Sequence, residues 1–202
     1  MFSKIKLAAV AAGSSLAMFA AVAPSAHAGL LSLATGACGA QESQPFAQFG
    51  DSNAYVQVPG GTFESGSPSW LLTGGASVVS GRAHEGSRSL SLPAGSKATS
   101  QAACTGIDHP SMRFFVRNTG SSTGRLKVYA TYPLLLGLPY TAYLGSVSGN
   151  GTWQPSSVVQ IGLLNNTLGS LTLAESTISF TLVPSGGNWH VDDVYLDPFH
   201  RY

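Results

Sequence analysis

The stretch Arg113-Phe114-Phe115-Val116-Arg117 alternates between large apolar and charged side chains. Successive side chains of a β-strand point to opposite faces, so Phe114 and Val116 are predicted to share one face. The two arginines and Phe115 would then share the other face. One apolar row and one mixed polar row are typical of an antiparallel sheet that has one face on the core and the other in water.

The same alternation occurs in two stretches further along the chain. In residues 126–131 every second residue is Leu, Val or Ala, and the residues between them are Lys, Tyr and Thr. In residues 178–182 the apolar side chains alternate with Ser and Thr. We therefore predict that one row from these stretches faces a core, namely Leu126, Val128, Ala130, Ile178, Phe180 and Leu182.

Short runs of β-favouring residues between glycine-rich turns fill the chain from residue 53 onward. Turn signals such as Gly60-Gly61 and Gly149-Asn150-Gly151 separate these runs. Apart from one candidate helical turn at residues 163–168, nothing after residue 28 shows a sustained helical period. The sequence therefore predicts an all-β protein with an antiparallel β-sandwich. The other predicted strands are residues 54–58, 70–72, 76–80, 88–92, 97–102, 141–147, 157–162 and 190–196.

The composition excludes two classes of protein. Charged residues make up only 9% of the 202 residues, with 10 Lys or Arg against 9 Asp or Glu. A formal net charge of +1 lacks the basic excess that nucleic-acid binding requires, so we expect no nucleic-acid partner. The hydrophobic fraction of 44% is too high for an intrinsically disordered chain.

The first 28 residues have the features of a secretory signal peptide. Lys4 and Lys6 precede an apolar stretch at residues 7–23, and Ala26-His27-Ala28 has the A-x-A pattern of a cleavage site. The alternative is an uncleaved anchor, but the apolar stretch is broken and falls short of the about 20 residues of a membrane-spanning helix. We therefore predict a secreted protein that begins at Gly29, has no transmembrane segment and is a monomer.

The two cysteines of the chain, Cys38 and Cys104, follow the predicted cleavage site. An even number of cysteines in an exported chain favours a disulfide, with two free thiols as the alternative. The bond would fasten an N-terminal lead at residues 29–50 to a domain at residues 51–202. Phe46 in this lead, together with the nearby Phe49, is expected to dock on the domain because large apolar rings are costly to leave in water.

Two motifs resemble those of a known family. Residues 60–66, Gly-Gly-Thr-Phe-Glu-Ser-Gly, followed by Trp70, resemble the opening G-x-F-E-x-G…W signature of carbohydrate-binding-module-like (galactose-binding-like) jelly rolls. Residues 188–196, Asn-Trp-His-Val-Asp-Asp-Val-Tyr-Leu, resemble the last strand of that fold. The resemblance covers residues 51–198 and implies a jelly-roll β-sandwich. The whole chain also resembles a group of small secreted actinobacterial proteins.

The resemblance implies one structural calcium ion between the two motifs. Its ligands would be Glu64 from the first motif, Asp192 and Asp193 from the second, and backbone carbonyls of residues 84–87. Calcium binds six to eight oxygen atoms, and carboxylates clustered without a cation would repel one another. Adjacent strand residues face opposite sides, so both aspartates would bind only at a β-bulge. The alternative is that these acidic groups accept hydrogen bonds from turn amides or pair with a nearby arginine, Arg82 or Arg88.

A sugar-binding patch is predicted around Tyr129, because sugars are recognised by flat aromatic faces with hydrogen-bonding groups around them. Lys127 lies on the same strand face, and Arg113 and Arg117 would lie nearby if their strand pairs with it. Three further tyrosines, Tyr132, Tyr140 and Tyr143, could line the rim of the patch. The alternative is that Tyr129 packs on Phe115 and that the three tryptophans lie in the core.

We predict a non-catalytic function for this chain. It has no G-x-S-x-G or H-E-x-x-H motif and no carboxylate pair with the arrangement of a glycosidase. The leading ligand class is carbohydrate or a cell-envelope glycan. The alternative is a structural or protein-interaction domain at the cell surface. The apolar loop at residues 133–139 would then be a partner contact, but a buried crossover under the edge of the sandwich is the preferred interpretation of this loop. A hydrolase is the weakest of the three hypotheses.

Overall fold

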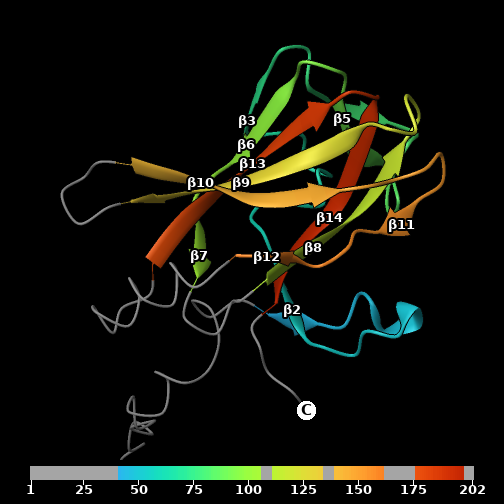
Figure 1. Ribbon diagram of the computed structural model, residues 1–202. Helices are drawn as coiled ribbons and strands as arrows, with labels where there is room; N and C mark the ends of the chain where they lie inside the picture. Colours follow the sequence, from blue (N-terminus) through green and yellow to red (C-terminus); the bar gives the residue numbers. More distant parts are fainter. Residues whose placement is uncertain (1–40, 106–110, 134–138, 162–175, 198–202) are drawn as a thin grey trace, which may run out of the picture. The chain divides into compact units, whose positions relative to one another are not determined.

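The computed structural model describes residues 41–105, 111–133, 139–161 and 176–197 (Figure 1). All of these residues belong to the unit Ala34–Tyr202. The predicted signal peptide, Cys38, the candidate helical turn and most of the apolar loop lie outside the described residues. Within the described ranges, no helix is both long enough and apolar enough to cross a membrane.

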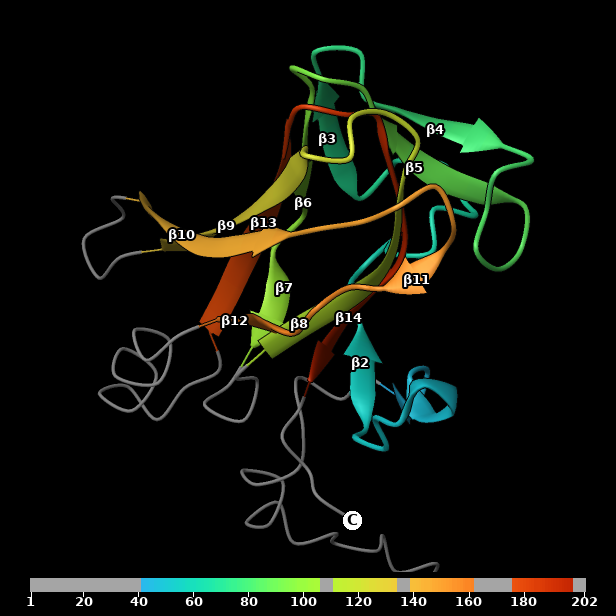
Figure 2. The same ribbon diagram turned by 45° about the vertical axis from the view of Figure 1, so that its right-hand side comes forward.

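The described residues form two antiparallel sheets, which confirms the predicted all-β sandwich (Figures 1 and 2). The strands of the eight-stranded sheet are β1 (Glu42–Ser43), β2 (Tyr55–Gln57), β4 (Ser77–Ser80), β5 (Arg88–Leu92), β8 (Ser111–Asn118), β11 (Gln154–Pro155), β12 (Val159–Gln160) and β14 (Trp189–Asp197). The strands of the six-stranded sheet are β3 (Trp70–Thr73), β6 (Lys97–Ser100), β7 (Ala103–Thr105), β9 (Arg125–Pro133), β10 (Pro139–Val147) and β13 (Ser176–Ser185).

The order of the strands is that of a jelly roll. The first sheet runs β1-β2-β14-β5-β4, with β8 beside β14 and with β11 and β12 paired to β8. The second sheet runs β10-β9-β13-β6-β3, with β7 paired to β13. The chain therefore passes back and forth between the two sheets. The early strand β2 lies next to the last strand β14, with Leu196 opposite Val56, as the two sequence motifs predict.

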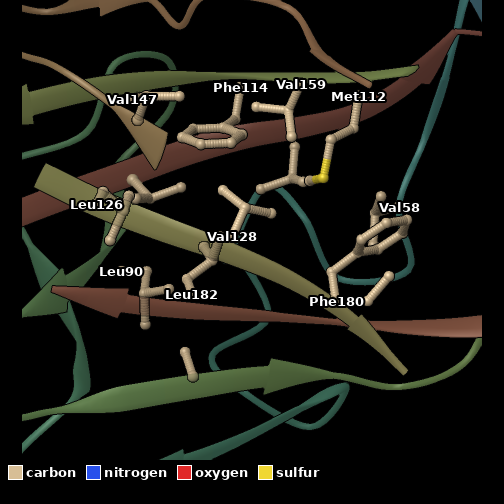
Figure 3. Packing of buried hydrophobic residues seen from close by; sticks show 14 of the residues in the cluster. Val58, Leu90, Met112, Phe114, Leu126, Val128, Val147, Val159, Phe180 and Leu182 are labelled. Carbon is tan, nitrogen blue, oxygen red and sulfur yellow. The ribbon is translucent and has the colours of Figure 1, made fainter. Parts of the chain in front are cut away.

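The core lies between the two sheets and is formed by the predicted apolar rows. Phe114 and Val116 from β8 and Val128 from β9 have no exposed surface. Figure 3 shows Phe114, Val128 and Leu182 among the side chains gathered between the strands. Burying each such side chain contributes about 1.5–3 kcal/mol, so these rows fix which face of each strand points inward.

A second apolar cluster lies on the outer side of the eight-stranded sheet. Phe46 is fully buried against Tyr55 and Phe115, and its ring stacks on that of Phe115 with 5.1 Å between the ring centroids. The predicted docking of Phe46 is therefore confirmed. Phe49, at the end of the short 3-10 helix η2 (Ala47–Phe49), is 48% exposed, but its ring also contacts that of Phe115, with 5.7 Å between the centroids. Phe115 is 2% exposed, so the outer face of β8 is not open to water at this position.

Candidate functional site

The outer face of the six-stranded sheet carries a continuous row of aligned side chains. Strand pairing places Leu71 opposite Thr99, then Thr181, then Tyr129 and finally Tyr143. Paired residues of an antiparallel sheet point to the same face, so these five side chains form one line across the strands β3, β6, β13, β9 and β10. These strands lie side by side in Figure 1. We call this row and the two rows that flank it the platform.

The two ends of the central row are strongly exposed. Tyr143 is 57% exposed, and its ring lies 5.3 Å from that of Tyr129 at an angle of 55°. Leu71 at the opposite end is 67% exposed. The platform therefore offers an aromatic pair at one end, an aliphatic side chain at the other and two threonines between them.

A β-bulge in β10 places both Tyr143 and Ser146 on the outer face of the sheet. The pairing shifts by one residue between Tyr143 and Gly145, so the extra residue Leu144 packs against the core. Gly145 has a φ of 145°, which an L side chain rarely adopts. Without this bulge, Tyr143 and Ser146 could not both lie on the outer face.

The flanking rows of the platform supply hydrogen-bonding groups. On one side, the hydroxyl oxygens of Thr131 and Thr141 lie 2.9 Å apart, just as those of Thr99 and Thr181 lie 3.0 Å apart in the central row. On the other side, pairing aligns Lys127 with Val183 on β13. One flanking row consists of Thr73, Lys97, Val183, Lys127 and Ser146. The other consists of Ser179, Thr131 and Thr141.

The platform has the chemistry of a binding surface rather than that of a hydrolase. Its three rows contain aromatic, aliphatic, hydroxyl and lysine side chains, and no carboxylate or imidazole. Glycoside hydrolysis by the usual routes requires two facing carboxyl groups. This set of groups can stack on apolar faces and exchange hydrogen bonds, and its described residues do not include the carboxyl pair of the usual glycosidases.

The structure separates the four predicted ligand-binding residues into two pairs. Tyr129 and Lys127 lie on β9 in the six-stranded sheet, whereas Arg113 and Arg117 lie on β8 in the other sheet. β8 pairs with β11, β12 and β14 and not with β9, so the single patch predicted from the sequence is wrong. The alternative contact of Tyr129 with Phe115 is excluded for the same reason.

Of the three tyrosines proposed for the rim, only Tyr143 belongs to the platform. Tyr132 is 3% exposed, and its hydroxyl donates a hydrogen bond of 2.8 Å to the carbonyl of Ile161. Tyr140 is opposite Tyr132 in the pairing, shares its direction and lies 6.4 Å from its ring. Tyr140 is therefore an exposed tyrosine of β10 that points away from the platform.

Arg113 has a structural role. Its Nη1 donates to Asp51 Oδ2, which also accepts a hydrogen bond of 2.6 Å from the hydroxyl of Tyr55. Its Nε and Nη2 both donate to the carbonyl of Ser156, at 3.2 and 3.0 Å. The guanidinium carbon also lies 4.5 Å from the centre of the Phe46 ring. These contacts hold the N-terminal segment on the outer side of β8 and leave few donors for a ligand.

A β-bulge in β14 brings both predicted aspartate ligands to the segment that follows β4. The pairing of β14 with β8 shifts between Asp192 and Tyr195, and Asp193 has a left-handed φ of 49°. The His84 amide donates to Asp192 Oδ2 at 2.8 Å, and His84 Nδ1 lies 2.9 Å from Asp193 Oδ2. The ring of His84 stacks on Phe115 with 3.5 Å between centroids, which fixes this side chain between the sheet and the acidic pair.

Glu64 accepts hydrogen bonds from turn amides, which is the alternative to a calcium ligand. Its Oε1 accepts from the backbone amides of Ser87 and Arg88 at 2.9 and 2.8 Å, and its Oε2 accepts from the Ser87 hydroxyl at 2.7 Å. The Ser87 hydroxyl and these amides lower the pKa of Glu64 below its usual value. Amide donors of residues 84–88, rather than carbonyl oxygens, thus face Glu64 and Asp192.

The acidic cluster formed by Asp192, Asp193 and Glu64 offers carboxylate oxygens, which calcium prefers, but fewer free oxygens than calcium needs. Burial, with the neighbouring charge of Asp193, raises the pKa of Asp192 to about 7, and burial also raises the pKa of Asp193. Asp193 Oδ1 accepts no hydrogen bond from a described residue. Across the described ranges, however, no group of three or more His, Cys, Asp or Glu side chains is arranged to hold a metal ion. Calcium at Glu64, Asp192 and Asp193 stays a prediction.

Comparisons with known proteins found likeness only among solved structures. No protein-family model matches the chain, and no curated protein matches it. The xylan-binding domain CBM22-1 of Xyn10C from Paenibacillus barcinonensis is 15% identical, covers 67% of this chain and 90% of its own, and has a TM-score of 0.46. Family 16 carbohydrate-binding module-2 is 18% identical over 67% of this chain and 95% of its own, with a TM-score of 0.46.

A third solved structure contains the CBM22-1 and GH10 modules of the Clostridium thermocellum xylanase Xyn10B in complex with xylohexaose. It is 16% identical, the match covers 67% of this chain and 27% of that chain, and the TM-score is 0.49. At such identities and TM-scores, these likenesses carry no argument about the ligand of this chain. The architecture and the platform are therefore described from the strands and side chains themselves.

Proposed function

We propose that this chain is a non-catalytic carbohydrate-binding module whose ligand lies on the platform. The observation that carries the proposal is the exposed row from Leu71 through Thr99, Thr181 and Tyr129 to Tyr143. Aromatic faces stack on the C–H surfaces of sugars, and hydroxyl groups exchange hydrogen bonds with sugar hydroxyls. The platform has both kinds of group on one face.

The dimensions of the platform favour a chain of sugars over a single sugar. Neighbouring strands of a sheet lie about 4.8 Å apart, so five strands span about 19 Å. The tyrosine pair and Leu71 lie at opposite ends of this span. A polysaccharide that runs across the strands would contact both ends, whereas a monosaccharide would contact only one. The ligand class that we propose is a neutral polysaccharide, because the central row offers aromatic, aliphatic and hydroxyl contacts. The two lysines of the platform, Lys97 and Lys127, can donate hydrogen bonds to sugar hydroxyls.

The tyrosine pair is expected to dominate binding. Replacing Tyr143 by alanine should weaken binding to a soluble polysaccharide about tenfold, because the most exposed aromatic ring of the platform is lost. Tyr129→Ala should have an effect of similar size. The matched control is Tyr140→Ala, since Tyr140 is an exposed tyrosine of the same strand that points away from the platform.

Affinity gel electrophoresis and titration calorimetry with xylan and with β-1,3-1,4-linked glucan would measure these effects. The wild-type protein and Tyr140→Ala should bind alike, and both platform variants should bind weakly. Equal loss in Tyr140→Ala and Tyr143→Ala would show that the effect is general, and unchanged binding in both platform variants would exclude the platform as the site.

The proposal includes export of the protein by the predicted signal peptide at residues 1–28. A disulfide between Cys38 and Cys104 would suit that environment. Cys104 lies at the centre of β7, where it is opposite Thr177 of β13, and Cys38 lies outside the described residues.

We also propose that calcium stabilises the fold at the acidic cluster of β14. The ion would be held by Asp192 and Asp193, where two buried carboxylates repel each other, and Glu64 and Glu85 add further negative charge near Asp193. Calcium should raise the melting temperature at pH 8 relative to a sample with EDTA. Magnesium is the matched control, because it requires a smaller and stricter octahedral site.

The variant that tests the calcium proposal is Asp193→Asn. Asparagine tolerates the left-handed backbone at this position, with its φ of 49°, so the bulge is retained while a charge is removed. The calcium-dependent rise in melting temperature should be smaller in this variant. A wild-type protein that melts at the same temperature in calcium and in EDTA would exclude the site.

A further inference from the structure

The outer face of the eight-stranded sheet carries a row of polar side chains on the opposite side of the sandwich from the platform. Pairing aligns Arg117 of β8 with His190 of β14, then with Ser91 of β5 and Ser77 of β4. Arg82 follows β4 in the chain, and its carbonyl accepts a hydrogen bond of 3.0 Å from the Ser89 hydroxyl. We call the row, together with Arg82, the arginine face.

Arg117 has no hydrogen-bond or ion-pair partner among the described residues. Its Nε is buried and unpaired, which is rare for a buried polar atom and requires an explanation. Arg113 provides a direct comparison, because it lies on the same face of the same strand and has Asp51, Ser156 and Phe46 as partners. Arg113 already donates from each of its side-chain nitrogens, whereas the side chain of Arg117 makes no hydrogen bond to a described residue.

Packing holds Arg117 in a defined position despite the lack of polar partners. Its guanidinium carbon lies 5.3 Å from the centre of the Trp153 ring, within the range of a cation–π contact. The Trp153 ring also contacts His190 edge to face, with 6.4 Å between the centroids. Trp153 is partly exposed and packs on the Phe46 cluster, so it anchors the arginine to the rigid part of the sheet.

The arginine face is positively charged and has no acidic partner of its own among the described residues. Arg117 and Arg82 are both close enough to His190 to act on it electrostatically. These two arginines supply the positive charge of the face. Neither arginine forms an ion pair with a described residue, and the acidic pair that follows in β14, Asp192 and Asp193, is bonded to His84.

We propose that the arginine face is a second binding site, which takes the carboxylate of an acidic polysaccharide. The planar guanidinium of Arg117 matches a carboxylate in shape and charge. Ser91 and Ser77 lie in the same row and can bond sugar hydroxyls, and Trp153 adds an apolar edge. This site lies on the other sheet from the platform and does not depend on the platform binding sugar.

A trimer of galacturonic acid is a suitable probe for this site. Trp70 and Trp189 are buried, so quenching of tryptophan fluorescence by the trimer reports mainly on Trp153. The wild-type protein should show saturable quenching that weakens at higher salt concentration. Arg117→Gln should weaken binding at least about tenfold, because the charged fork is lost while the side chain keeps its stem.

Four controls test whether the quenching depends on the arginine face and on the carboxylate of the sugar. Arg125→Gln removes an exposed arginine from β9 in the other sheet and should leave binding unchanged, as should Tyr143→Ala on the platform. A neutral galactose trimer should not quench. Sodium sulfate at the same charge concentration should compete only weakly, since it lacks the sugar hydroxyls that bond the serines.

The outcomes distinguish a site for sugar carboxylates from a general anion site. Saturable quenching that Arg117→Gln abolishes, with Tyr143→Ala unaffected, would support the second site even if the platform bound no sugar. Sulfate that competes as well as the trimer would contradict a sugar-specific site and indicate a general anion site. Equal binding by wild type and Arg117→Gln, or no binding of the trimer, would overturn the proposal.

Discussion

Replacing Arg113 by alanine is expected to lower the free energy of unfolding by about 3 kcal/mol, the lower end of the range for breaking a buried ion pair, because this pair is only partly buried. The substitution leaves the carboxylate of Asp51 without its charged partner and the carbonyl of Ser156 without its two donors. It also removes the cation that lies over the Phe46 ring. Urea unfolding monitored by circular dichroism would measure the change.

The network around Arg113 explains why one residue has so large an effect. Burial alone would raise the pKa of Asp51, but hydrogen bonds from Tyr55, the Asn53 amide and Arg113 outweigh it, so the pKa lies below its usual value. The ionised carboxylate is therefore stabilised in the folded state. Because Asp51 precedes β2 and Ser156 follows β11, Arg113 joins two segments that flank β8.

Arg117→Ala is the matched control for this prediction, because Arg117 lies on the same strand face without polar partners among the described residues. Its loss should change the free energy of unfolding by less than about 1 kcal/mol. A double-mutant cycle with Asp51→Asn would isolate the Arg113 and Asp51 contact. Equal destabilisation by the two arginine variants would contradict the division into a structural and a free arginine.

The alternation of side chains was sufficient to predict most strands and the face that each one buries. Residues 113–117, 126–131 and 178–182 all lie in strands whose predicted inward rows are buried. This succeeded because the period of a strand is local and depends only on neighbouring residues. The short strands β1, β7 and β11 were missed, since two or three residues are too few to show an alternation.

The sequence could not assign strands to sheets, and this is why the predicted patch was wrong. Arg113 and Tyr129 occur on successive long strands, β8 and β9, which suggested that these strands pair. In a jelly roll the chain instead crosses to the other sheet between them. The partner of a strand depends on contacts far away in the sequence, so alternation alone cannot distinguish a hairpin from a crossover. Tyr143 was predicted only as a rim residue, because its place opposite Tyr129 depends on the register between β9 and β10, which alternation does not give.

The pH dependence of stability is expected to show two opposing effects from one strand. Burial and the charge of Asp193 raise the pKa of Asp192 from 3.8 to about 7 in the folded state. The stability that this group contributes is present below the unfolded pKa and is lost as the pH rises towards 7. Burial likewise raises the pKa of Asp193, which acts in the same direction.

His190 acts in the opposite direction. Burial, with the charges of Arg117 and Arg82, lowers its pKa from 6.5 to about 4. The folded protein therefore resists protonation, and stability is lost as the pH falls from 6.5 towards 4. As the pH falls through this window, His190 lowers the stability of the wild-type protein while Asp192 raises it. The two effects therefore offset each other in the wild-type pH profile.

Two variants separate these effects when unfolding is measured in EDTA at about pH 4.5 and pH 6.5. The free energy of unfolding of His190→Gln, taken relative to that of wild type, should be on the order of 2 kcal/mol higher at the lower pH than at the higher pH. The variant no longer pays the cost of keeping a buried imidazole unprotonated in the folded state. Asp192→Asn should change by a similar amount with the opposite sign, because it removes a group that favours the folded state when protonated. Changes of the same sign in both variants, or none in either, would show that these two buried side chains do not control the acid response of the sandwich.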